Sequence, residues 1–237
     1  MELKEIMFLI VVVLTNIIEA ITGFAGTMLA MPPSMFLIGV DEAKVILNLI
    51  SLILATSTTI RYRKDTNYRE FFKISTFMIL GTITGLYIYS ILPVWYLIKI
   101  YGVIILIVVI RGLLVKEEKK VSKNILVVVL IVAGIIHGMF LSGGALLVIY
   151  AVEVLKEKST IRATLAPVWI VLNGMILIQD IIMNKFTYNL QKLSLQSLIP
   201  LLVAFIIGGI LHKKINQDFF VKLTYGLLIF SGVTLLV

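Results

Sequence analysis

The sequence predicts an all-α, polytopic integral membrane protein made of two inverted repeats, and three observations predict it. Of the 237 residues, 60% are hydrophobic and only 14% are charged, whereas a soluble domain is about 45–50% apolar and about 25% charged. Apolar stretches of membrane-segment length follow one another along the chain, separated by short charged loops. The order of these stretches and of several motifs is the same in both halves.

Each half contains about five apolar stretches, of which the first two in the first half are short. The stretches cover 5–22, 24–40, 43–60, 72–92 and 95–114 in the first half, and 124–139, 142–155, 161–183, 191–211 and 217–237 in the second. We therefore divide the chain into a first transmembrane repeat (1–115), a charged cytoplasmic linker (116–123) and a second transmembrane repeat (124–237).

The repeat is visible in the residues as well as in the hydropathy. GFAGTMLAMP (Gly23–Pro32) corresponds to FLSGGALLVI (Phe140–Ile149), and each is followed by a short charged loop, DEAK in one half and KEKSTIR in the other. The other matched positions are Tyr68 with Tyr188, and Tyr101-Gly102 with Tyr225-Gly226. Each Gly-rich segment interrupts a short apolar stretch, which predicts a broken or hairpin helix there.

The distribution of Lys and Arg predicts the orientation in the membrane. If each Gly-rich segment forms a hairpin, most of the 21 basic residues fall on one side, and the positive-inside rule makes that side cytoplasmic. The basic residues on the other side are Lys4, Lys44, Lys99, Lys185 and Lys192. An odd number of segments per repeat makes the halves run in opposite directions, with both termini outside.

The two Gly-rich segments predict the substrate site. Gly and Pro at membrane depth leave backbone groups that protein, water or a ligand must satisfy, and paired breaks at equivalent positions of two repeats point to a site at the midplane. A helix that restarts after a break offers free N–H groups and a positive dipole end to an anion. Close helix packing is the alternative interpretation of these glycines. The substrate-binding candidates are Gly23, Gly26, Thr27, Asn48, His137, Ser142, Gly143, Gly144 and Asn173.

Two ionisable residues near the breaks are candidates for proton coupling. Glu19 precedes the first break and His137 occupies nearly the same place before the second. The alternatives are an interfacial carboxylate for Glu19 and a packing histidine for His137. Asn48 and Asn173 could line the cavity or hydrogen-bond between helices. We expect Asp180, near a helix end, to be exposed at the interface.

The Gly-rich segments are also similar to a family signature. GFAGTMLAMP resembles the G-F-G-G-G-x-L-x-x-P pattern of the sulfite exporter TauE/SafE family, and GMFLSGGALLV (Gly138–Val148) resembles its second copy. The basic loop RYRKDTNYREF, the G-x-x-x-G of Gly81 and Gly85 and the L-P-x-x-x-L of Leu92–Leu97 also resemble family features. The family usually has Gly where Ala25, Thr27 and Ser142 stand, and Pro where Ile149 stands. The resemblance implies export of sulfite or small organosulfur anions such as sulfoacetate, driven by an ion gradient.

The predicted function is that of a secondary transporter, an exporter of a small anion such as sulfite or an organosulfonate, working by alternating access. A passive anion channel of the same architecture is the alternative. The chain has no Cys, and its two His residues, His137 and His212, are far apart, so we expect no metal and no cofactor. Enzyme motifs such as G-x-S-x-G, H-E-x-x-H or a phosphate-binding loop are missing from the sequence, so we expect no enzyme.

The expected partners and cellular location follow from the same sequence features. The partners are a small anionic substrate and the lipid bilayer, with a second copy of the chain as a homodimer and no nucleic acid. The expected location is the plasma membrane of a prokaryote, with the chain crossing it several times. The exact anion, the direction of transport and the coupling ion are left open by the sequence.

Overall fold

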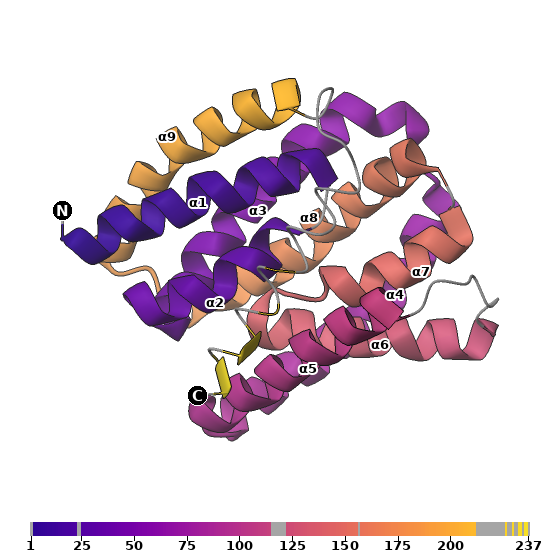
Figure 1. Ribbon diagram of the computed structural model, residues 1–237, viewed down its shortest axis with the longest axis horizontal. Helices are drawn as coiled ribbons and strands as arrows, with labels where there is room; N and C mark the ends of the chain where they lie inside the picture. Colours follow the sequence, from indigo (N-terminus) through magenta and orange to yellow (C-terminus); the bar gives the residue numbers. More distant parts are fainter. Residues whose placement is uncertain are drawn as a thin grey trace.

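A computed structural model describes residues 2–22, 25–114, 122–155 and 157–211, together with the single residues 226, 229, 232, 233, 235 and 236. The helices of the first half are α1 (Leu3–Thr22), α2 (Gly26–Ile38), α3 (Val40–Tyr62), α4 (Tyr68–Ile91) and α5 (Val94–Leu114), with a short 3₁₀ turn, η1 (Arg63–Asp65), after α3. Those of the second half are α6 (Lys123–Phe140), α7 (Gly144–Leu155), α8 (Lys158–Ile182) and α9 (Tyr188–Leu211). The described part is thus helical, with short connections (Figure 1).

The all-α membrane class is confirmed within the described residues. Six of the described helices are long and apolar enough to cross a membrane, whereas α2, at 13 residues, is a shorter apolar helix. The predicted stretches 24–40 and 142–155 correspond to the short helices α2 and α7. The last predicted segment lies almost wholly outside the described residues, and so do Gly23 and most of the linker.

The charged segment DEAK, and the part of KEKSTIR from Lys158 onwards, lie in helices although we expected loops. DEAK lies in the first turns of α3, and Gly39, with a φ of 93°, is the single residue between α2 and α3. Glycine adopts such a positive φ without the steric cost that a side chain would add. Asp41 and Glu42 then lie in the first turn of α3, where negative charge favours the helix dipole. In the second half, Lys158–Arg162 lies in α8.

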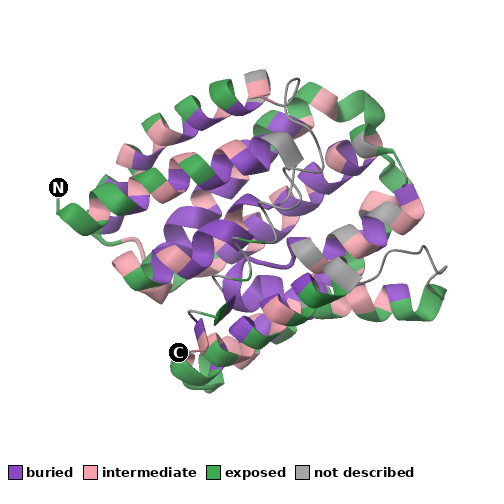
Figure 2. Cartoon of the chain, viewed as in Figure 1, coloured by how far each residue is buried: buried purple, intermediate pink, exposed green. Residues whose placement is uncertain are grey.

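The buried residues gather in the middle of the bundle. In Figure 2 the faces of α3 and α8 that turn inward are buried, whereas the outer faces of the surrounding helices are exposed. Many exposed side chains are large and apolar, for example Leu80, Ile107 and Ile199. A contiguous apolar exterior is unfavourable in water and is what lipid requires.

The helix contacts have the same pattern in the two halves. The central pair is α3 with α8; α4 packs against α6 as α9 packs against α1; and α4 contacts α8 as α9 contacts α3. In Figure 1, α1 runs from left to right and its counterpart by order, α6, runs from right to left. The contacts between the halves are therefore matched for three pairs of counterparts, which are α1 and α6, α3 and α8, and α4 and α9.

Glycines bring α4 and α6 into backbone contact. A Cβ on Gly81 would meet the carbonyl oxygen of Ile131, and a Cβ on Gly138 would meet the carbonyl oxygen of Thr82. Gly85 and Gly134 lie against the facing backbone in the same way. The G-x-x-x-G of α4 is therefore a packing motif, of the kind that lets membrane helices approach closely.

Candidate functional site

A buried polar network lies where α3, α6 and α8 meet. His137 Nε2 is 3.0 Å from Asn173 Oδ1, and Asn173 Nδ2 donates to Ser51 Oγ at 3.0 Å. Asn48 Nδ2 donates to the backbone oxygen of Asn173 at 3.1 Å. Asn48, His137 and Asn173 are each at most 2% exposed. Three of the candidates from the sequence thus lie in one network that joins the two halves.

Helix periodicity places these side chains together. Asn48 and Ser51 are three residues apart on α3, and Trp169 and Asn173 are four apart on α8, so each pair shares one helix face. His137 lies in the last turn of α6, and its ring centroid is 5.2 Å from that of Trp169. Trp169 therefore forms one wall of the network.

Two polar atoms of this network have no hydrogen-bond partner among the described residues. They are His137 Nδ1 and Asn48 Oδ1, and both are buried. Buried polar groups are normally hydrogen-bonded to protein or to ordered water. These two atoms are therefore free to bond with a ligand or with water, one from each half of the chain.

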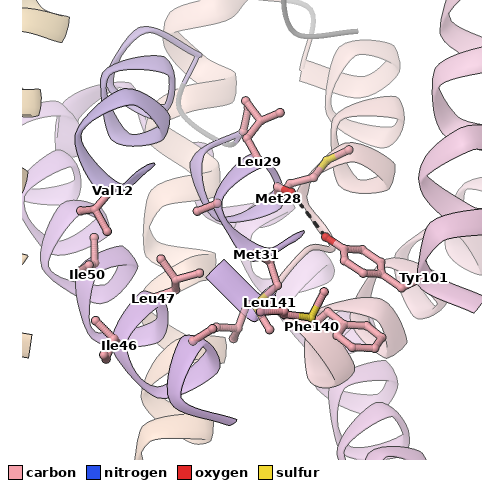
Figure 3. Packing of buried hydrophobic residues seen from close by; sticks show 14 of the residues in the cluster. Val12, Met28, Leu29, Met31, Ile46, Leu47, Ile50, Tyr101, Phe140 and Leu141 are labelled. Atoms are coloured by element: carbon pink, nitrogen blue, oxygen red, sulfur yellow. Dashed lines mark hydrogen bonds between the residues drawn. The ribbon is translucent and has the colours of Figure 1, made fainter. Parts of the chain in front are cut away.

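The second break connects the network to α5. Ser142 Oγ accepts a hydrogen bond from Tyr101 at 2.6 Å and donates to the Phe140 oxygen at 2.8 Å. The Tyr101 ring stacks on Phe140 with centroids 4.5 Å apart, and its hydroxyl also lies 3.5 Å from the Met28 oxygen of α2 (Figure 3). The hydroxyl of Ser142, a substrate-binding candidate from the sequence, is thus hydrogen-bonded within the protein.

The glycines of the second break allow a close approach of α6 and α7. A Cβ on Gly143 would meet the carbonyl oxygen of Ala133 and would come within 2.9 Å of His137 Cβ. Gly144, the first residue of α7, is also buried. Gly143 therefore positions His137 by close packing. Close helix packing is the alternative role that the sequence left open for these glycines.

At the first break, Glu19 occupies the start of α2. Its carboxylate lies directly against Gly26, where an added Cβ would overlap Oε2, and it accepts the backbone N–H of Thr27. Glu19 is 7% exposed, so its side chain is buried within the protein. A carboxylate thus sits at the helix N-terminus that we expected to receive the substrate anion, because that terminus attracts any nearby negative charge.

The structure adds Lys44, which the sequence analysis counted only as a surface charge. Lys44 is 3% exposed; its Nζ donates to the Gly138 oxygen at 3.2 Å and lies 3.6 Å from the centre of the Tyr89 ring. The Tyr89 hydroxyl in turn donates to Asp41 at 3.0 Å. A sequence signal existed: Lys44, Asn48 and Ser51 follow the spacing of one helix face.

Lys44 lines a cavity of about 390 Å³ at one end of the α3–α8 pair. Its charged and aromatic lining comprises Asp41, Lys44, Tyr89, Asp180 and Lys185. Asp180 is 4% exposed and pairs with Lys185 at 3.1 Å, so the expectation that it is exposed is wrong. The reason is the turn after α8, in which Asn184 has a φ of 53° and brings Lys185 back over the helix end. Lys44 and Lys185 belong to the sparsely basic side, which we predict to be outside.

The opposite end of the α3–α8 pair is held by hydrogen bonds. Thr66 Oγ1 donates to the Ala163 oxygen at 3.1 Å, and the Asn67 N–H donates to Thr164 Oγ1 at 3.0 Å. Tyr150 donates to Glu70 at 2.6 Å nearby. The first two contacts tie the loop after α3 to the start of α8, and the third ties α7 to α4, all on the side with most basic residues.

The polar groups of the network and of the cavity can bind a polar ligand through hydrogen bonds and charge. Among the residues that the structure describes, no group of three or more His, Asp or Glu side chains could hold a metal ion. The network offers an imidazole, amides and a hydroxyl, and the cavity offers paired charges. A polytopic helical membrane protein with a buried polar centre between its halves is the class that the fold and the site define.

Comparison with known families names the group within that class. A sequence model of the family described as sulfite exporter TauE/SafE matches residues 8–235. The chain therefore belongs to the TauE/SafE family and is an integral membrane transporter of that family, which is not a family of enzymes. No match was found among curated proteins or among solved structures.

Proposed function

We propose that the protein is a secondary transporter that exports a small anion, such as sulfite or an organosulfonate, by alternating access around the network of Asn48, His137 and Asn173. The observation that carries this proposal is the network itself, which is buried, joins both halves and leaves one polar atom of each half free. Intramembrane polar groups without partners are costly unless a ligand or water uses them.

We further propose that the two halves are inverted repeats. The matched helix contacts and the opposite courses of α1 and α6 support this arrangement. In transporters built this way, one repeat moves against the other around a fixed site at the repeat interface. The α3–α8 pair, with a cavity at one end and hydrogen bonds at the other, fits a state that faces the sparsely basic side.

Proton coupling would pass through Glu19 or His137, since both are buried titratable groups beside the breaks. Glu19→Gln and His137→Ala, each assayed for transport against pH, test this assignment. Loss of both the pH dependence and the proton-driven transport in one variant would identify the coupling residue, whereas faster transport with less pH dependence would indicate repulsion of the anion. Unchanged pH dependence in both would remove the coupling role from both side chains.

A passive anion channel of the same architecture is the second candidate function. The observation that favours it is the cavity between charged side chains at one membrane side. A channel conducts without saturation at low substrate concentration and without exchange of one substrate for another, whereas alternating access produces both. Concentration series and exchange assays therefore separate the two functions.

The membrane location and the oligomeric state are also part of the proposal. We place the protein in the plasma membrane of a prokaryote with the heavily basic side in the cytoplasm. A homodimer is also expected, and crosslinking in native membranes would test it.

The experiment that tests the function uses the purified protein in liposomes. Sulfite, sulfate, sulfoacetate, acetate and chloride are applied with and without a pH gradient, and the electrogenic response is recorded. We expect a saturable response to a sulfur oxyanion or organosulfonate, and its dependence on the gradient would identify protons as the coupling ion. Silence across the panel, from folded protein, would contradict the proposed substrate class.

A further inference from the structure

The cavity beside α3 carries two buried charges of opposite sign. Lys44 is 3% exposed and Asp180 is 4% exposed, and both line the same cavity of about 390 Å³. Lys44 comes from the first half of the chain and Asp180 from the second. A ligand in this cavity would therefore touch one ammonium and one carboxylate, supplied by the two halves.

Each of these charges keeps bonding capacity for a ligand. Lys44 has three N–H donors, and the contacts of its Nζ are one carbonyl oxygen and one aromatic face. Within the described residues the only ion pair joins Lys185 to Asp180 Oδ1, so Lys44 has no carboxylate partner there. The second oxygen, Asp180 Oδ2, is buried and has no hydrogen-bond partner among these residues.

The charges that line the cavity also balance. Asp41 and Asp180 are offset by Lys44 and Lys185. A ligand with a net charge would upset this balance in a site surrounded by lipid and protein, where an uncompensated charge is expensive. A ligand that carries both charges would leave the balance intact and would satisfy both buried groups.

We propose that this cavity binds a small zwitterion, with its acid group at Lys44 and its ammonium group at Asp180 Oδ2. The proposal rests on the proposed transport function, and it adds to that function a preference, among organosulfonates, for acids that also carry an amine. Lys44 also links the cavity to the central network, because its Nζ donates to the oxygen of Gly138, the residue after His137. In export, a ligand that leaves the network would thus pass Lys44 on its way to the sparsely basic side.

The test compares three ligands of nearly equal size, namely aminoethanesulfonate, hydroxyethanesulfonate and ethanesulfonate. Their binding to the purified full chain in nanodiscs is measured by calorimetry. We expect the amine to bind at least about tenfold tighter than ethanesulfonate, because a site built for a polar group rejects an analogue that lacks it. Asp180→Asn should reduce that preference to about twofold or less, and Lys44→Met should weaken all three ligands.

Ser57→Ala is the matched control, since Ser57 is exposed on α3, lies outside the cavity lining and donates to the Ile53 oxygen of its own helix. It should leave the preference unchanged. Ethanesulfonate binding as tightly as the amine would overturn the zwitterion proposal while leaving the anion transporter standing. Silence towards all three ligands, in protein with a normal melting curve, would overturn the zwitterion proposal and remove organosulfonates from the proposed substrates. Asp180→Asn preserves side-chain shape, so a retained preference in this variant would also overturn the proposal.

Discussion

The two helix breaks are built alike but are connected differently. At the first break the Glu19 side chain lies against Gly26, and at the second the His137 side chain lies against Gly143. In each case a titratable residue of a long helix packs on a glycine at the start of a short one. The two breaks therefore resemble each other in their side-chain contacts as well as in their sequences.

Their hydrogen bonds lead to different places. Glu19 bonds to the backbone of Thr27, in the short helix that follows it. His137 bonds instead to Asn173, which in turn bonds to Ser51 and is approached by Asn48 on α3. A carboxylate at the first break repels an anion, whereas amide, hydroxyl and imidazole groups at the second can donate to it. From this comparison we propose that the anion binds at the second break.

The largest effect is expected from Asn173→Leu. This change removes the hydrogen-bond partner of His137 and of Ser51. Each buried polar group left without a partner costs about 1–3 kcal/mol of stability. We expect transport to fall about 100-fold or more, the equivalent of about 3 kcal/mol. Liposome flux measures it, with the exposed Asn189→Ala as control. Near-normal flux in Asn173→Leu would contradict the proposal that the network binds the substrate.

Gly143→Ala should be the next largest change. The added Cβ would meet the backbone oxygen of Ala133, which can move only if α6 and α7 separate. We expect a loss of about 1–3 kcal/mol in stability, which is usual for overpacking, and a lower melting temperature. Gly174→Ala is the control, because nothing lies within 4 Å of that Cβ position. It should be neutral or stabilise α8 by up to about 1 kcal/mol. Equal melting temperatures for both variants would contradict the close packing.

Glu19→Gln should make the first break more tolerant of anions. The change keeps the shape of the side chain but removes a negative charge, and a repulsion of about 1 kcal/mol corresponds to about fivefold in affinity. Acidification of the wild type acts in the same direction, because protonation of Glu19 also removes the charge. We therefore expect transport by the wild type to rise as pH falls, and by Glu19→Gln to be faster and less dependent on pH. The exposed Glu157→Gln should behave as the wild type. Slower transport by Glu19→Gln at every pH would contradict the repulsion.

The smallest effect is expected from Tyr101→Phe. The Tyr101 hydroxyl links the two breaks, through Ser142 at 2.6 Å and the Met28 oxygen at 3.5 Å. Its removal leaves the stacking on Phe140 intact and costs about 0.5–1 kcal/mol, as interhelical hydrogen bonds usually do in membranes. The melting temperature measures this loss, and Tyr87→Phe at an exposed position is the control. A melting temperature equal to that of the control would show that the link contributes nothing.

The fold was predictable because the bilayer imposes the pattern that the sequence displays. A chain in lipid must satisfy its backbone inside each segment, so apolar runs translate directly into helices. The stretch predicted at 95–114, for example, is α5 from Val94 to Leu114. The short helices at both breaks were also predicted, because Gly and Pro mark them in the sequence.

The partners within the site were less predictable. Asn48, His137 and Asn173 stood out as polar residues in apolar runs, but their mutual contacts depend on how α3, α6 and α8 cross. Lys44 was missed because its charged neighbours resembled a loop, although Asp41 and Glu42 favour a helix start there. Asp180 was misread because its burial depends on Lys185, beyond the end of the helix. Such contacts between distant residues have no local signal.

The most direct test of the account is counterflow in liposomes with radiolabelled sulfoacetate. Vesicles loaded with unlabelled substrate should take up label faster than empty vesicles, with saturation, because alternating access exchanges substrate across the central network. Asn173→Leu should abolish this exchange. Uptake that rises linearly with concentration and is not stimulated by internal substrate would contradict alternating access and support the channel.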